Sequence, residues 1–159
     1  MSTKVPNIQN FDLPPDARVA IVAAQFNAEY VDELLRGCVN RLKELKLDDA
    51  RLAIHRVPGA FELPLAAKML AGTYQFDAIV CLGCVIRGET PHFDYVAGEC
   101  ARGIQQVALE TMTPIIFGVL TTNTEEQVRD RLGGKHGHAG ARAADAAAEM
   151  IALARSVRK

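Results

Sequence analysis

The sequence predicts a layered α/β fold built on a parallel sheet, and three observations support this prediction. Short apolar runs of the kind that form buried parallel strands recur along the chain. Segments whose apolar residues recur at helical spacing alternate with these runs. Polar loops follow the runs, as is typical where ligands bind at the carboxyl ends of parallel strands. We therefore expect an α/β/α sandwich of three layers around a four-stranded parallel sheet.

Two strand–helix units are expected in the first half of the chain. Residues 18–24 predict the first strand, and the helix after it is expected to begin at Asn27, a residue type suited to the N-cap. Residues 50–57 predict the second strand. Residues 60–70 predict the next helix, which tolerates Pro64 because proline fits the first turn.

The second half continues the alternation and adds a glycine-rich break. The expected strands cover residues 78–86 and 115–120, and the expected helices cover residues 92–112, 125–132 and 141–157. Glycines interrupt the helical pattern between residues 133 and 140. This segment, which contains Lys135, is either a flexible connector or a loop that holds an anion.

The first residues differ from the rest in composition. Three prolines within residues 1–16 block a helix, and apolar residues are sparse there. We expect residues 1–16 to form an extended arm and residues 17–159 to form a single domain. The arm either frays or adds a strand to a sheet edge, such as that of a neighbouring subunit.

Composition excludes several classes of function. The chain has 159 residues, of which 49% are hydrophobic and 23% charged, as in a soluble domain with a core. The net charge is −1 and no basic block occurs, which argues against nucleic acid as a partner. No apolar stretch reaches the roughly 18 residues of a membrane span, and the N-terminus lacks the apolar core of a signal peptide. The expected compartment is the cytoplasm.

The cysteines and histidines do not predict a metal or redox site. Cys81 and Cys84 form a C-x-x-C motif, but they lie within an expected strand, where positions three apart face opposite ways. We expect buried free thiols instead. His136 and His138 lack the nearby carboxylate or cysteine that would complete a metal site. These residues therefore predict no metal site. No cofactor is expected either, because the P-loop spacing has Glu89 in place of the lysine and no dinucleotide fingerprint follows the first strand.

The loop between the strand 78–86 and the following helix is the first candidate for a functional site. Its polar residues end at His92, in the first turn of the helix. A cation is unfavourable at a helix N-terminus, so an imidazole there tends to stay neutral, as a general base must. The same helix start offers free N–H groups to an anion. The alternative is a plain surface histidine behind an N-cap at Thr90.

Aromatic residues occur at the carboxyl ends of other expected strands, and all these loops should lie at one edge of the sheet. Phe26 is either a wall for a flat ligand or a hydrophobic staple packed on Val31. Phe61 and Glu62 follow the second strand, where Glu62 also favours the helix dipole. Phe117 begins the segment that leads into the last loop.

Four segments of the chain resemble one family, the 6,7-dimethyl-8-ribityllumazine synthases. They are QFN at 25–27, VPGAFELP at 57–64, GCVIRGETPHFDYV at 83–96 and FGVLTTNTEEQ at 117–127, with Arg131 after them. The resemblance implies a flavodoxin-like fold and a transferase of riboflavin biosynthesis. Such an enzyme condenses 5-amino-6-(D-ribitylamino)uracil with 3,4-dihydroxy-2-butanone 4-phosphate and releases phosphate and water.

The resemblance also assigns roles to residues. His92 matches the acid/base histidine. The pyrimidine-binding positions are matched by Phe26, Ala60, Phe61, Glu62, Cys84, Val85, Ile86 and Phe117. The positions on the phosphate side are matched by Glu89, Thr90, Arg131 and Lys135. In the family, the counterparts of Phe117 and Arg131 come from the adjacent subunit.

One departure and one implication for assembly accompany the resemblance. The family often shows an asparagine-lysine-glycine step after Lys135, whereas this chain has His138-Ala139-Gly140. A second cation of that segment is therefore missing. The short connector after Arg131 resembles members that assemble as sixty-subunit shells of pentamers, for which riboflavin synthase is a further expected partner.

Three other functions are compatible with parts of this sequence. A related archaeal-type riboflavin synthase would act on the lumazine product itself. A non-catalytic relative would bind ligands or form shells, although His92 and Arg131 argue against it. A generic flavodoxin-like binding domain is supported only by the fold pattern.

Overall fold

The central sheet is parallel and has the strand order β2-β1-β3-β4 in the computed structural model, which describes residues 12–158. In chain order, its strands are β1 (Val19–Ala24), β2 (Leu52–Val57), β3 (Ala78–Ile86) and β4 (Ile115–Thr122). The register brings the carboxyl ends level within two pairs of strands, because Ala24 pairs with Val57 and Ile86 with Thr122, and β3 continues past its last β1 pair, Ala23 with Leu82. The loops after the strands therefore leave the sheet at one edge.

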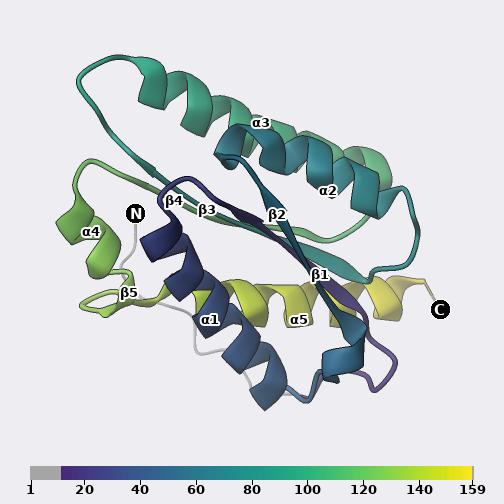
Figure 1. Ribbon diagram of the computed structural model, residues 1–159. Helices are drawn as coiled ribbons and strands as arrows, with labels where there is room; N and C mark the ends of the chain where they lie inside the picture. The colour runs from purple at the N-terminus through teal and green to yellow at the C-terminus, as the bar shows by residue number, and fades with distance from the viewer. Residues whose placement is uncertain (1–11, 159) are drawn as a thin grey trace.

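Helices cover both faces of the sheet and complete the three layers predicted from the sequence. Figure 1 shows α2 and α3 on one face and α1 and α5 on the other. The helix bounds are α1 (Ala28–Glu44), α2 (Leu63–Ala71), α3 (His92–Thr111), α4 (Glu125–Arg129) and α5 (Ala139–Val157), with single 3₁₀ turns η1 (Asp49–Arg51) and η2 (Ala60–Glu62). No helix within residues 12–158 has the length and apolar character to cross a bilayer.

Alternate residues of the inner strands point into two separate hydrophobic cores. Ile21 of β1 packs in the core that includes Leu34 of α1, whereas its neighbour Val22 packs in the core that includes Leu63 of α2. All four side chains are fully buried. Successive side chains of a strand face opposite sides, so strands covered on both faces are apolar at every position.

The cysteines of the C-x-x-C motif follow the same alternation. Cys81 lies in the core beneath α2 and α3, and Cys84 lies in the core beneath α1 and α5, as their spacing predicts. Both are buried free thiols. Burial raises the pKa of the Cys84 thiol to about 12 and that of Cys81 further. Neither is a thiolate near neutral pH.

The sequence-based boundaries were wrong after β4. The helix predicted over residues 125–132 ends at Arg129, because a two-stranded antiparallel hairpin of β5 (Leu132–Gly134) and β6 (Gly137–His138) follows it. Gly133 and Gly137 adopt positive φ angles of 101° and 71°, which glycine accepts without strain. Helix α5 then begins at Ala139, two residues before the expected start.

His138 fixes the start of α5 against α1. Its Nδ1 accepts hydrogen bonds from the N–H groups of Gly140 (3.2 Å) and Ala141 (3.4 Å), which is an N-cap role. A Cβ at Gly140 would overlap the backbone carbonyl of Leu34, so the two helices approach closely only because this residue is glycine. Burial, followed by the charges of Arg142 and Arg36, lowers the pKa of His138 and favours the neutral ring that this cap requires.

Only the end of the predicted N-terminal arm falls within the described residues. Leu13 is buried in the core beneath α1 and α5, and its N–H donates to the carbonyl of Leu45 at 2.7 Å. The prediction that the arm frays or adds a strand to a sheet edge refers mainly to residues 1–11, which lie outside the described part of the chain.

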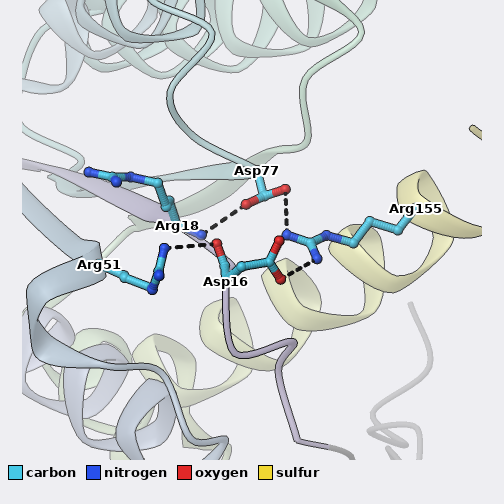
Figure 2. Close-up of polar contacts among 5 residues, drawn as sticks. All are labelled: Asp16, Arg18, Arg51, Asp77 and Arg155. Carbon is cyan, nitrogen blue, oxygen red and sulfur yellow. Dashed lines mark hydrogen bonds and ion pairs between the residues drawn. The ribbon is translucent and has the colours of Figure 1, made fainter.

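A cluster of ion pairs holds the amino ends of the strands to the end of α5. Arg155 donates to the carboxylates of Asp16 (2.7 Å) and Asp77 (3.1 Å), and Asp77 also accepts the backbone N–H of Arg18 (2.9 Å), as Figure 2 shows. Arg51 donates to the backbone carbonyl of Asp16 at 3.3 Å. The cluster lies at the end of the sheet opposite the polar loops, so we assign it to stability.

Arg155→Ala should lower the melting temperature of the protein by about 2–4 °C at neutral pH, measured at one fixed protein concentration. The hydrogen bond from Arg155 holds the pKa of Asp16 below its ordinary value of 3.8. This contribution is therefore present above pH 3.8 and is lost as the pH falls through the lowered value. The difference between variant and wild type should shrink on acidification, and a difference that grows would contradict the assignment.

Candidate active site

A hollow of about 470 Å³ opens where the loops after β1, β2 and β3 meet the start of α3. Loops from three strands can meet there because parallel strands end at a common edge. The sequence-predicted site residues that line it are Phe26, Ala60, Phe61, Glu62, Cys84, Val85, Ile86, Thr90 and His92. This volume is in the range of small-molecule sites.

Two aromatic rings stand at the hollow with much of their surface in water. Phe26 is 72% exposed and Phe61 is 58% exposed. A staple of Phe26 on the fully buried Val31 would cover the ring, so that interpretation of Phe26 was wrong. Rings exposed beside a concave apolar surface are suited to stacking on a flat ligand.

The turn that carries Phe26 is anchored to both neighbouring strands. Gln25 and Phe26 donate their N–H groups to the carbonyls of Val57 (2.8 Å) and Pro58 (3.0 Å). Asn27 adopts a left-handed conformation with φ 56°, and its Nδ2 donates to the carbonyl of Cys84 at 2.9 Å. Asn27 stands at the N-cap position, but its side chain does not cap α1 as we expected. It instead holds the turn against the end of β3.

Glu62 is fixed by its own loop. Its Oε2 accepts the N–H of Gly59 at 2.9 Å, which places the carboxylate at the wall of the hollow beside Phe61. The sequence also predicted that the Glu62 carboxylate interacts favourably with a helix dipole. Its position agrees with this prediction, because Glu62 directly precedes α2.

His92 is the first residue of α3 and is exposed at the hollow. Its backbone N–H donates to the hydroxyl of Thr90 at 3.4 Å, and Pro91 rather than Thr90 occupies the N-cap position. No hydrogen bond joins its imidazole to any of residues 12–158. Both ring nitrogens are therefore available to a bound molecule.

A residue that the sequence did not single out, Arg87, braces the loop before His92. Its guanidinium makes a two-pronged ion pair with Asp94 (2.9 and 3.4 Å) and donates through Nε to Asn123 (3.1 Å). It also stacks 4.2 Å from the centre of the Phe93 ring, which lines the hollow. The contacts join the β3–α3 loop, the first turn of α3 and the loop after β4.

Arg87→Ala tests whether this loop positions His92 for the predicted acid/base role. In that case kcat should fall about 10-fold and the KM for either substrate should change much less, because small displacements of a catalytic group are costly. Steady-state kinetics with each substrate varied in turn would measure both constants. Asp94→Ala should lower kcat in the same direction, and the double variant should be little worse than Arg87→Ala alone, since both substitutions remove the same ion pair.

Arg102→Ala provides the matched control for Arg87, because Arg102 is an exposed arginine of α3 that pairs with Glu99 at the surface, away from the loop before His92. It should retain wild-type kinetics. Equal loss of kcat in the Arg102 variant would show that the effect is not particular to the loop before His92.

A second hollow, of about 310 Å³, lies along the open edge of β4 beside the start of α5. Phe117, which is 43% exposed, and the half-buried Arg131 line this second hollow rather than the one at His92. Arg131 donates to the carbonyl of Gln127 at 2.9 Å. Among residues 12–158, the predicted site residues that line a hollow are therefore divided between two hollows.

Two predicted residues line neither hollow. Glu89 is exposed in the β3–α3 loop, and Lys135 is exposed between β5 and β6. Asn27, Arg87 and Arg142 are near the hollows but were not predicted as site residues. Their positions follow from contacts between segments distant in sequence, and the only local signal was that Asn27 and Arg87 lie in polar loops after strands.

Comparison with known proteins gives consistent matches. The family model described as 6,7-dimethyl-8-ribityllumazine synthase matches residues 16–155. The 6,7-dimethyl-8-ribityllumazine synthase of Edwardsiella ictaluri (strain 93-146) is 47% identical over 152 residues, which cover 95% of this chain and 97% of that relative.

Proposed function

Because the chain belongs to the 6,7-dimethyl-8-ribityllumazine synthase family, we propose that the first hollow is where it carries out the reaction of that family. The chain is a transferase of riboflavin biosynthesis. It condenses 5-amino-6-(D-ribitylamino)uracil with 3,4-dihydroxy-2-butanone 4-phosphate, and the products are 6,7-dimethyl-8-ribityllumazine, phosphate and water.

The pyrimidine binds in the first hollow. The exposed rings of Phe26 and Phe61 provide flat apolar surfaces for the heterocycle. The end of β3, at Cys84, Val85 and Ile86, supplies backbone groups that hydrogen-bond the pyrimidine edge. Ala60 contributes a small residue beside the ring, and the Glu62 carboxylate accepts hydrogen bonds from ribityl hydroxyls.

His92 transfers protons. The amine of the pyrimidine attacks the ketone to give an imine, phosphate leaves, and proton shifts at carbon and nitrogen precede ring closure. An imidazole can both accept and donate protons in these steps. The exposed imidazole, which no described residue engages, supports this role.

Arg131 binds the phosphate of the ketone, and Glu89, Thr90 and Lys135 flank it. Arginine remains charged throughout and its planar fork suits phosphate oxygens. Binding the phosphate while it is still attached keeps the two substrates in one geometry, which is worth several orders of magnitude in rate.

Arg131 and Phe117 reach the substrates from the adjacent subunit. The separation of the two hollows within one chain supports this division, since a single chain leaves His92 and Arg131 in different places. The family forms oligomers. We propose a cytoplasmic pentamer with sites between neighbouring subunits, further assembled into a sixty-subunit shell that can associate with riboflavin synthase. The open edge of β2, where Ile54 is 47% exposed, is where a neighbour's arm would add a strand.

The observation that carries this proposal is the convergence of the nine predicted residues on one hollow. Purified protein mixed with both substrates should produce lumazine fluorescence and one phosphate per lumazine. The two signals should require both substrates together. Consumption of added lumazine with formation of riboflavin would instead identify a riboflavin synthase.

A further inference from the structure

The second hollow contains an arginine that the proposed function does not use. Arg142, in the first turns of α5, lines this hollow together with Arg131 and Ala139. Both arginines are half-buried. Two guanidinium groups at one concave surface are an unusual arrangement unless an anion lies between them, because like charges repel.

Neither guanidinium is neutralised by the described part of its own chain. Arg131 donates to the carbonyl of Gln127 (2.9 Å) and Arg142 to the carbonyl of His136 (2.6 Å). Within residues 12–158, neither has an ion pair with a carboxylate, whereas Arg41 and Arg155 pair with aspartates. A guanidinium carries several N–H donors, so most donors of both side chains are available to a ligand.

A backbone hydrogen bond joins the two segments that carry these arginines. The N–H of Ala139 donates to the carbonyl of Arg131 at 2.8 Å, which joins the start of α5 to the end of the α4 segment. The Arg142 side chain extends over the β5–β6 turn, where a Cβ on Gly137 would lie 3.1 Å from Nη1. Residues 139 and 142 are three apart on a helix and share a face. Because the side chain of Ala139 is small, it leaves space on that face of α5 for the longer side chain of Arg142.

We propose that Arg142 is a second phosphate-binding residue, which grips the phosphate of 3,4-dihydroxy-2-butanone 4-phosphate together with Arg131. The inference rests on the proposed function, since it assigns a ligand to the same shared site. Ala139 stands where the family's asparagine-lysine-glycine step has its lysine. Arg142, one helical turn later, supplies the positive charge that this alanine lacks. Two guanidinium groups match the several oxygens of a phosphate monoester better than one.

The first test compares Arg142→Ala with wild type in two measurements. We expect the KM for the phosphorylated ketone and the inhibition constant of inorganic phosphate to rise about 10-fold, as loss of a charge-assisted hydrogen bond predicts. The KM for the pyrimidine should change less than about twofold. Arg142→Lys should be intermediate, because an ammonium keeps the charge without the planar fork.

A rescue variant makes the test specific. Ala139→Lys in the Arg142→Ala background restores one cation on the same helix face and should recover most of the lost affinity for phosphate. Lys43→Ala, which removes one exposed positive charge near the end of α1, is the matched control for net charge and should leave both constants unchanged.

Three outcomes would overturn the inference. These are unchanged constants for ketone phosphate and inorganic phosphate in Arg142→Ala, an equal rise in the pyrimidine KM, and failure of Ala139→Lys to recover any affinity in a correctly assembled protein. If Arg142→Ala does not assemble, the same constants are measured with Arg142→Gln, for which the same rise is expected, and with Arg142→Lys, for which the intermediate rise is expected. Calorimetric titration of inorganic phosphate tests the site even if wild type makes no lumazine, a result that would refute the proposed function alone.

Discussion

His92→Ala should lower kcat at least about 100-fold, the lower end of what general acid–base catalysis contributes. The imidazole lies at the hollow with no hydrogen bond to the described residues, so its removal deletes a proton carrier and disturbs little else. The affinity for the pyrimidine should change only a few-fold, because Phe26, Phe61 and Glu62 remain. Steady-state kinetics and equilibrium titration of the pyrimidine would measure the two quantities.

Chemical rescue separates proton transfer from structural damage in this variant. Free imidazole added to His92→Ala should raise its rate in proportion to concentration, since the shortened side chain leaves room for the ring. His55→Ala, at an exposed histidine of β2, is the control and should keep the wild-type rate. Unchanged turnover in His92→Ala would remove the histidine from the mechanism.

Arg131→Ala should reduce kcat/KM for the phosphorylated ketone about 100-fold, since charge-assisted bonds to phosphate oxygens are worth about 1.5–3 kcal/mol each. We expect most of the loss in the KM for this substrate and a smaller loss in kcat, because the phosphate is also the leaving group. Arg131→Lys should recover only part of the activity, because lysine lacks the planar fork.

The matched control for Arg131 is Arg129→Ala, two residues away. Arg129 pairs with Glu125 at the surface and donates to the Tyr30 hydroxyl, and it lines neither hollow. This control should leave the ketone KM unchanged. An Arg131 effect confined to the pyrimidine would contradict the assignment to phosphate.

The fold was predictable where the chain carries strong periodic signals. The predicted strand 78–86 coincides with β3, because an apolar run that is broken only by Gly83 and buried on both faces is apolar at almost every position. The hairpin of β5 and β6 could not be predicted, since strands of three and two residues are too short to show an alternation. The second strand was expected to begin at residue 50, but β2 begins at Leu52. The cause is local, because the Asp48 side chain caps the 3₁₀ turn η1 by accepting the N–H of Ala50.

The site was predictable as a set of loops but not as a set of contacts. The parallel topology alone brings the loops of Phe26, Phe61 and His92 to one edge of the sheet, independently of side-chain contacts. The bond from Asn27 to the carbonyl of Cys84 joins residues 57 apart, and the ion pair that braces Arg87 depends on how the first turn of α3 is oriented. Nothing local in the sequence of α5 placed Arg142 beside Arg131.

The most direct test of the shared site mixes two inactive variants. Each chain of His92→Ala retains Arg131, and each chain of Arg131→Ala retains His92. If the two residues act across a subunit boundary, co-assembled chains regain intact sites, with about a quarter of wild-type activity expected for random mixing in a cyclic oligomer. Mixed assemblies that remain as inactive as either parent, with both chains present by mass spectrometry, would contradict the account.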